Sequence, residues 1–176
     1  GTGRNGVDTD VYLAEVASPS TARRLTEETG TWVPVEFSPD GERLLVKQNR
    51  AIDDADLWMV DLKTRTRSRL TPDPATAGKG SVRHAAFSGD GRAIYVVTDR
   101  GSEFSQLFRV DAGRPEAPWT NLTSDLRWNV EALAVAPDGT LAYAVNEDGF
   151  SKLYLQRPGE KKRTPIAVPP GVVGEM

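Results

Sequence analysis

The sequence predicts an all-β fold made of repeated four-stranded units. A turn motif occurs three times, as FSPDG at 37–41, FSGDG at 87–91 and VAPDG at 135–139, and its aspartates are 50 and 48 residues apart. A short apolar stretch follows each copy, and no segment places apolar residues at helical spacing over about ten positions. Four antiparallel strands in a repeat of this length are typical of a β-propeller blade. We therefore expect a partial β-propeller of about three and a half blades, with almost no helix.

Two further landmarks keep their order from one unit to the next. The first is a strand motif that includes Asp56-Leu57-Trp58, and the second is a closing Arg69-Leu70-Thr71. Because three landmarks recur in constant order, they indicate an internal repeat. The strand motif lies at 10–15, 56–61, 106–111 and 152–155, and the closing motif lies at 24–26, 69–71 and 121–123.

Each full unit is expected to contain four strands, named A to D in chain order. The Asp-Gly pair between A and B indicates a hairpin, because glycine accepts the positive φ of a tight turn and aspartate accepts hydrogen bonds from nearby amides. We therefore assign Asp40, Gly41, Asp90, Gly91, Asp138 and Gly139 to structural turns. The expected strands are A at 33–38, 83–88 and 130–136; B at 43–48, 93–98 and 141–146; C at 10–16, 56–62, 105–111 and 151–156; and D at 22–25, 66–70, 119–122 and 163–168.

The repeat boundaries divide the chain into four segments. Residues 1–30 supply half a blade, the outer strands C and D, and full blades follow at 31–78, 79–128 and 129–176. Closing a ring takes about four to eight blades, so we expect one fragment of a larger propeller domain. Its apolar blade faces are expected to be exposed and to favour self-association.

Composition excludes several classes of function. The 22 Lys+Arg against 25 Asp+Glu give a net charge of −3, so we expect no nucleic-acid partner. No apolar run approaches the length of a membrane span and no targeting signal opens the sequence, which leaves a bacterial cytoplasm or periplasm open as the compartment. With no cysteine and only one histidine, His84, we expect no catalytic residue, no metal site and no cofactor.

An arginine recurs at one position of the connection between strands B and C. Arg4, Arg50 and Arg100 each stand seven residues before the first apolar residue of strand C, and Asn146 takes that place in the last copy. A ring of guanidinium groups could bind carboxylate or carbonyl oxygens of a peptide, so Arg50 and Arg100 are our candidate substrate-binding residues. A structural salt bridge between blades is the favoured alternative. Its candidate acidic partners are Asp8, Asp99 and Glu103.

The same connection carries an acidic cluster in the second unit. Asp53, Asp54 and Asp56 lack the ligand alternation and the glycine of a calcium loop. We expect them to form a solvated acidic loop.

The repeat resembles that of a known family. The Phe-Ser-Pro-Asp-Gly strand, the Asp-Leu-Trp-Met-Val-Asp-Leu strand at 56–62 and the Arg-Leu-Thr closure are similar to the WD40-like repeats of TolB-type propellers. The same repeats occur in the N-terminal propeller of the prolyl oligopeptidase (S9) family of serine peptidases. The stretches at 98–104 and 146–154 resemble the bacterial acylaminoacyl-peptidase and dipeptidyl-peptidase-like branch.

The resemblance implies a two-domain parent protein. In that family a seven- or eight-bladed propeller caps a C-terminal α/β-hydrolase domain that holds the Ser/His/Asp triad, and the propeller limits access to oligopeptides. This chain has no Gly-x-Ser-x-Gly elbow. The nearest sequence, at 149–153, ends in leucine, and we expect its Ser151 to be a turn residue in a hairpin.

The resulting hypothesis is a non-catalytic propeller segment of an S9-type serine peptidase. Its partners would be the hydrolase domain of the parent chain and, through it, a peptide substrate. The alternative is a TolB-like propeller that acts as a protein–protein interaction module. A propeller enzyme with a site in its channel is a weaker third hypothesis, because the expected A strands offer only Glu36 and Glu131 as acidic residues.

Overall fold

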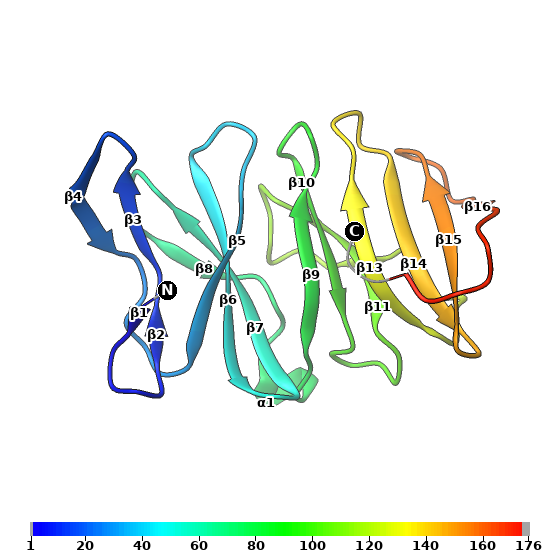
Figure 1. Ribbon diagram of the computed structural model, residues 1–176, viewed down its shortest axis with the longest axis horizontal. Coiled ribbons are helices and arrows are strands. Elements are labelled where there is room, and N and C mark those ends of the chain that lie inside the picture. Colours follow the sequence, from blue (N-terminus) through cyan, green and yellow to red (C-terminus); the bar gives the residue numbers. More distant parts are fainter. Residues whose placement is uncertain (1, 174–176) are drawn as a thin grey trace. The chain divides into compact units, whose positions relative to one another are not determined.

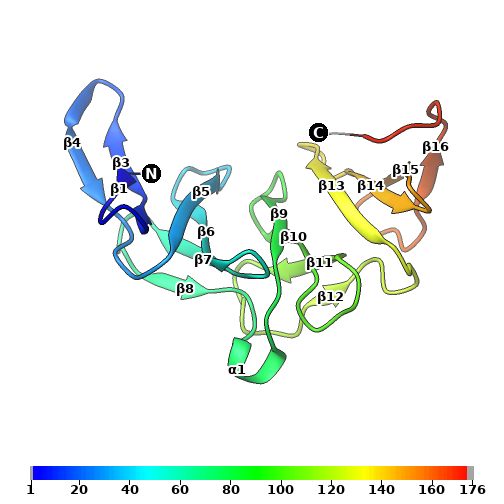
Figure 2. The same ribbon diagram turned by 60° about the horizontal axis from the view of Figure 1, so that its bottom comes forward.

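The computed structural model of the chain describes residues 2–173 and is shown in Figure 1. The chain forms two compact units, which divide between Lys79 and Gly80. Almost all regular structure is β-strand. A single turn of helix, α1 (Pro74–Ala77), follows Asp73, whose carboxylate accepts a hydrogen bond from the Ala75 amide (Figure 2).

The first unit contains a six-stranded sheet and a two-stranded sheet. The larger sheet has the order β1-β2-β5-β6-β7-β8, and β3 pairs with β4. The sheet continues past β5 because Thr9 pairs with Thr31 in parallel, while every other pairing is antiparallel. The strands are β1 (Thr2–Gly3), β2 (Thr9–Asp10), β3 (Tyr12–Glu15), β4 (Ser18–Arg24), β5 (Thr31–Phe37), β6 (Arg43–Ala51), β7 (Asp54–Asp61) and β8 (Arg67–Arg69).

The second unit consists of two four-stranded antiparallel sheets. Their orders are β12-β11-β10-β9 and β13-β14-β15-β16. The all-β prediction with four-stranded antiparallel sheets is therefore confirmed. The strands are β9 (Val82–Phe87), β10 (Ala93–Thr98), β11 (Gln106–Asp111), β12 (Thr120–Asn121), β13 (Asn129–Val135), β14 (Leu141–Glu147), β15 (Phe150–Gln156) and β16 (Thr164–Ile166).

The Asp-Gly turns join β5 to β6, β9 to β10 and β13 to β14. The Asp40 carboxylate accepts hydrogen bonds from Ser38 Oγ at 2.5 Å and from the Glu42 amide at 3.0 Å, and Gly41 has a φ of 71°. Asp90 repeats this pattern with Ser88. The hydrogen bond from the serine hydroxyl is the main reason that the pKa of Asp40 and Asp90 lies below its ordinary value.

The third turn differs because Ala136 stands where the other two copies have serine. Asp138 still accepts a hydrogen bond from the Thr140 amide at 2.9 Å, and this bond is the main cause of its lowered pKa. Gly139 keeps the positive φ, at 83°. The turn therefore depends on its aspartate and glycine, while the serine is an addition.

The two sheets of the second unit pack face to face. Tyr95, Val97 and Leu107 of the first sheet contact a fully apolar surface of the second. At 25 cal/mol per Å² of buried apolar surface, such a cluster is the main source of stability for the unit. The second sheet contributes Val130, Leu133, Leu141, Tyr143 and Val145.

The core of the first unit lies between its larger sheet and the β3–β4 hairpin. Trp32 is 1% exposed and its ring centroid lies 5.9 Å from that of Trp58. The cluster also contains Val11, Leu44, Val46, Val60 and Leu62, with Leu13 and Leu25 packed against it.

Gly89 explains why the second turn motif departs from Pro-Asp-Gly. A Cβ at this position would lie 2.0 Å from the Pro137 carbonyl oxygen, so the turn between β13 and β14 leaves no room for a side chain. We predict that Gly89→Ala lowers the free energy of unfolding by about 1–3 kcal/mol, the range typical of overpacking. Urea denaturation of the variant measures this change.

Gly171→Ala is the matched control for Gly89→Ala. No heavy atom lies within 4 Å of a Cβ built at Gly171, and its φ is outside the left-handed region. The control is expected to unfold at the wild-type midpoint. Equal midpoints for Gly89→Ala and Gly171→Ala would contradict the steric explanation.

Candidate functional site

Arg50 is held by two carboxylates of its own hairpin. Its Nε and Nη2 donate to the two oxygens of Asp54, both at 2.9 Å, and its Nη1 pairs with Asp56 Oδ2. The hydrogen bonds to Asp54, and after them the bond to Asp56, raise the pKa of Arg50 above its already high value. Asp56 is 0% exposed. The expected solvated acidic loop is therefore wrong for Asp54 and Asp56, because the arginine at the end of β6 draws both carboxylates inward.

Asp56 also ties the outer strand to the sheet. Its Oδ1 accepts a hydrogen bond from Thr71 Oγ1 at 2.8 Å, and its Oδ2 lies 3.8 Å from Arg69 Nη1. Arg69 pairs in turn with Asp73 at 2.7 Å. The buried carboxylate thus lies between two arginines, one on each side of β7.

The first unit repeats this cluster one copy earlier. Arg4 Nε lies 3.4 Å from Asp10 Oδ2 and its Nη2 lies 3.6 Å from Asp8. Arg24 Nη1 lies 3.8 Å from Asp10, and its Nη2 pairs with Glu27 at 2.6 Å. Asp8 is one of the acidic partners that the sequence suggested. In both clusters the carboxylates follow the arginine by four and six residues.

The third copy replaces the ionic cluster with amides. Gln106 stands where Asp56 does, Asn121 stands where Arg69 does, and the Asn121 amide donates to Gln106 Oε1. Arg100 is 6% exposed, and its Nη2 donates to the Gly80 carbonyl at 3.4 Å. A Cβ on Gly80 would lie 2.5 Å from Arg100 Cα, so a glycine is needed where the chain passes this residue.

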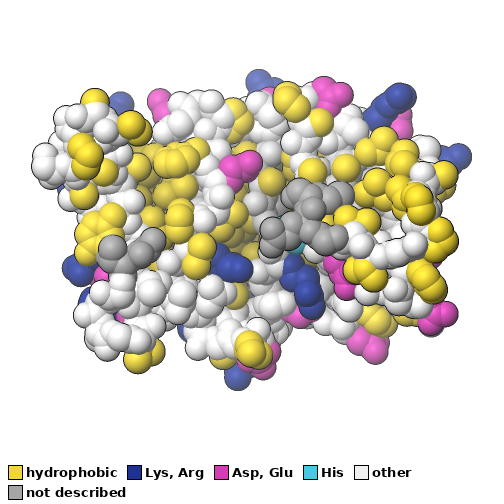
Figure 3. All heavy atoms as spheres, viewed as in Figure 1, with side chains coloured by type: hydrophobic (Ala, Val, Ile, Leu, Met, Phe, Trp, Pro, Cys, Tyr) yellow, Lys and Arg dark blue, Asp and Glu magenta, His cyan; other side chains and the backbone are white. Residues whose placement is uncertain are grey.

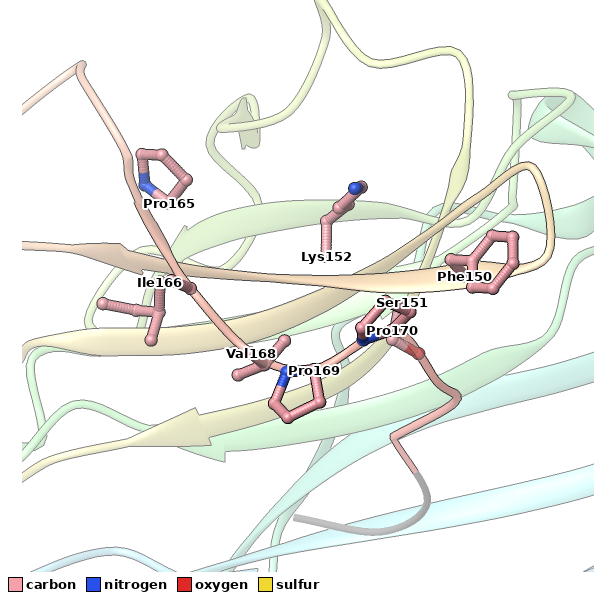
Figure 4. A pocket seen from close by; sticks show the side chains of 9 residues that line it. Phe150, Ser151, Lys152, Pro165, Ile166, Val168, Pro169 and Pro170 are labelled. Atoms are coloured by element: carbon pink, nitrogen blue, oxygen red, sulfur yellow. The ribbon is translucent and has the colours of Figure 1, made fainter.

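The fourth copy replaces the cluster with an apolar groove. Phe150, Lys152, Pro165 and Ala167 occupy the positions of Asp54, Asp56, Arg69 and Thr71, as the pairing of β15 with β16 shows. The groove has a volume of about 540 Å³, and Figure 4 shows the segment from Pro165 to Pro170 along one side of it. Phe150 is 52% exposed.

Ser151 fixes the segment that closes this groove. Its amide donates to the Gly171 carbonyl at 2.9 Å, and its Oγ accepts from the Val173 amide at 2.8 Å. Ser151 is the second residue of β15 and is 5% exposed, so the expectation of a turn residue is wrong. The turn consists of Asp148 and Gly149 alone, with φ values of 56° and 87°, because Glu147 of β14 already pairs with Phe150 of β15.

His84 contacts the neighbouring sheet of its unit. Its Nε2 lies 2.7 Å from the Glu131 carbonyl oxygen, which joins β9 to β13. Among residues 2–173, no group of three or more histidine, aspartate or glutamate side chains is arranged to bind a metal ion. Within the same residues, the structure has no helix long and apolar enough to span a membrane.

The bonds of Arg50 give it a structural role that can be measured. Removing one partner of a buried ion pair costs about 3–5 kcal/mol, but the Arg50 side chain is 29% exposed. We therefore predict that Arg50→Gln lowers the free energy of unfolding by about 1–3 kcal/mol, because it removes the charged hydrogen bonds of Arg50 to Asp54 and Asp56. Chemical denaturation measures this loss.

Arg114→Gln is the control, since the Arg114 side chain is 73% exposed and pairs with Asp111 at 3.2 Å. Its stability is expected to stay within about 0.5 kcal/mol of the wild type. If Arg50→Gln were equally neutral, the structural role of the cluster would be refuted.

Known proteins resemble this chain in part of its sequence and in its fold. No family model matches the sequence. Over 105 residues the chain is 29% identical to dipeptidyl aminopeptidase BIII of Pseudoxanthomonas mexicana, and the match covers 58% of this chain and 15% of that protein.

Solved propellers share the fold over most of the chain. TolB from Acinetobacter baumannii is 25% identical, with a TM-score of 0.65 over 89% of this chain and 37% of its own. A structure from a study of two prolyl endopeptidases is 20% identical, with a TM-score of 0.73 over 91% of this chain and 23% of its own. These comparisons confirm the propeller fold and the likeness of the repeats to TolB and to the propeller portion of S9-type peptidases.

Proposed function

We propose that this chain is a non-catalytic propeller segment of an S9-type serine peptidase, and that it gates the access of oligopeptides to a hydrolase domain. The observation that carries the proposal is the similarity to a dipeptidyl aminopeptidase over 105 residues. The chain spans only a small part of that relative, so the peptidase activity is proposed for a parent protein. The division into blades at 1–30, 31–78, 79–128 and 129–176 is part of the same proposal.

The chemistry of the described residues supports a non-catalytic role. The single histidine, His84, lies at hydrogen-bonding distance from a backbone carbonyl, and the buried Asp10 and Asp56 face arginines. A general base must lie within reach of a substrate proton, whereas Asp10 and Asp56 are only 1% and 0% exposed. We therefore assign no catalytic residue and no cofactor to this chain. Its proposed partners are the hydrolase domain and, through it, a peptide substrate, with no nucleic acid or membrane.

Arg50 and Arg100 are proposed as contacts for the passing peptide. The three hydrogen bonds of Arg50 leave two of its five N–H donors, and its side chain is partly exposed. Such donors suit the carbonyl oxygens of a peptide backbone. Arg100 holds the equivalent position of the next repeat, although its 6% exposure makes Arg50 the better residue to test.

The chain alone is predicted to have no peptidase activity. The assay uses chromogenic dipeptidyl, aminoacyl and acylaminoacyl substrates with the purified chain. No turnover above a mock purification is expected, because no activated nucleophile is assigned. Turnover that co-purifies with the chain and is lost in a His84→Ala variant would contradict the proposal of a non-catalytic segment.

The gating proposal is tested in the complete reading frame. A Gly-x-Ser-x-Gly elbow followed by Asp and His is expected downstream of the propeller. Arg50→Lys in that protein is expected to change kcat/KM for long peptides relative to dipeptides, because lysine keeps the charge but loses the planar donor pair. An unchanged ratio in a stable variant would count against gating through Arg50.

The alternative is a TolB-like interaction module. It is favoured by the 25% identity to the A. baumannii TolB structure over 89% of this chain. A reading frame without the hydrolase elbow would support this alternative and exclude the peptidase proposal.

Self-association through exposed sheet faces is also proposed. Phe37 on β5 and Phe150 on β15 are 49% and 52% exposed, and Leu155 is 36% exposed. Figure 3 shows hydrophobic side chains gathered over β15 and β16. Contiguous exposed apolar patches are typical of surfaces that bind other proteins.

We predict that the chain forms oligomers at micromolar concentration and that Phe150→Ser shifts it toward monomer. Sedimentation velocity measures the distribution. Ile52→Ser is the matched control, since Ile52 is 103% exposed in the β6–β7 turn, outside the sheet faces. A wild-type chain that sediments as a monomer at all concentrations would contradict the prediction.

A further inference from the structure

The second unit contains a cavity that is separate from the arginine clusters and from the groove beside β15. Its volume is about 850 Å³, and it lies between the two sheets at the end where their Asp-Gly turns meet. The turns after β9 and β13, strand β12 and the connection from β15 to β16 form its walls. Gly89 and Pro137 are in contact here, so the two turns meet at one side of the cavity.

The carboxylates of the lining already have partners or stand at the rim. Asp90 and Asp138 accept hydrogen bonds within their own turns, and Asp125 pairs with Arg163. Glu160 is exposed at the mouth. The hydrogen bond from Arg163 lowers the pKa of Asp125, so this carboxylate is an anion that is already matched.

Three exposed cationic side chains, those of Arg109, Arg157 and Lys161, line the cavity. The charge of Arg157 helps to lower the pKa of Asp138, whereas no ion pair joins Arg109 to another residue of the range 2–173. Tyr95 is 94% buried, at 6% exposure, and also lines the cavity. Its hydroxyl has no hydrogen-bond partner in the described part of the chain. The hydroxyl borders the cavity, where a ligand acceptor can take its hydrogen bond.

Part of the lining is apolar, beside polar residues such as Asn121 and Ser124. Leu122, Leu141 and Ala93 contribute side chains, and Leu141 and Ala93 are 3% and 2% exposed. Cavities of about 300–1,000 Å³ with an apolar lining and a few convergent polar groups are typical of small-molecule sites. The size and lining therefore suit a ligand with an apolar body and one acceptor group.

We propose that this cavity binds a ligand that carries a single carboxylate on an apolar body. The carboxylate accepts from Arg109 and from the Tyr95 hydroxyl, and the apolar body packs on Leu122 and Leu141. Four carboxylates in the lining disfavour a dianion such as phosphate, because each added charge meets their repulsion. The same chemistry can come from a free carboxylic acid or from an acidic peptide.

The test titrates the isotope-labelled chain with 3-phenylpropanoate and, separately, with the blocked dipeptide acetyl-Asp-Leu-amide. Saturable NMR shifts at the Leu122 and Leu141 amides are expected with at least one of them. The tighter ligand identifies the source of the carboxylate. The neutral 3-phenylpropanamide is expected to bind at least about tenfold more weakly, since a charged hydrogen bond is lost.

Variants separate the site from general charge. Arg109→Gln and Tyr95→Phe are each expected to weaken binding about three- to tenfold while the unfolding midpoint stays unchanged. Arg114→Gln removes an exposed arginine outside the cavity and is expected to leave binding unchanged. Equal binding of acid and amide, shifts outside the cavity, or an equal effect of Arg114→Gln and Arg109→Gln would overturn the proposal.

Discussion

In each of the first two repeats, a buried carboxylate joins an arginine that precedes it to an arginine of the outer strand. Asp10 and Asp56 are 1% and 0% exposed, and each lies between an arginine of the preceding connection and an arginine of the outer strand. Moving an ion out of water costs several kcal/mol, so these carboxylates are stable only with both arginines present. The outer strand β8 has only three residues and contributes few ladder hydrogen bonds, so the contact of Arg69 with Asp56 adds to its attachment.

The sequence was sufficient for the sheets and for the position of the arginines. The repeat of Asp-Gly turns predicted the hairpins, and the offset of seven residues found Arg4 and Arg50. The acidic partners of these two arginines were only partly predicted from the sequence. Asp54 and Asp56 alternate along β7 and so lie on one face, and this period of two could have indicated that both reach Arg50. Comparing the two copies would have strengthened that inference, since Asp8 and Asp10 keep the same spacing.

Contacts between sheets could not be predicted from one repeat. Gly89 interrupts the Pro-Asp-Gly pattern because the Pro137 carbonyl occupies the space of a side chain, and the local sequence of either turn carries no sign of this contact. Ser151 was misplaced for a similar reason. Its motif suggests a hairpin end, but its hydroxyl and amide bind residues 171–173, which are distant in sequence. The cavity beside Tyr95 likewise is lined by residues of two sheets, so one repeat alone does not predict it.

One position of the repeat carries three different chemistries over its four copies. The amides of Val11, Leu57 and Leu107 each donate to a threonine hydroxyl of the closing motif, at 2.9, 3.3 and 2.9 Å. This bond is the same in three copies, while the neighbouring side chains form ionic clusters in the first unit and an amide pair in the third copy. The fourth copy has Ala167 in place of the threonine and an apolar groove in place of the polar groups. The ionic clusters bury Asp10 and Asp56, whereas the groove leaves Phe150 52% exposed. A repeat that keeps its ladder can thus place binding chemistry in one copy without loss of the fold.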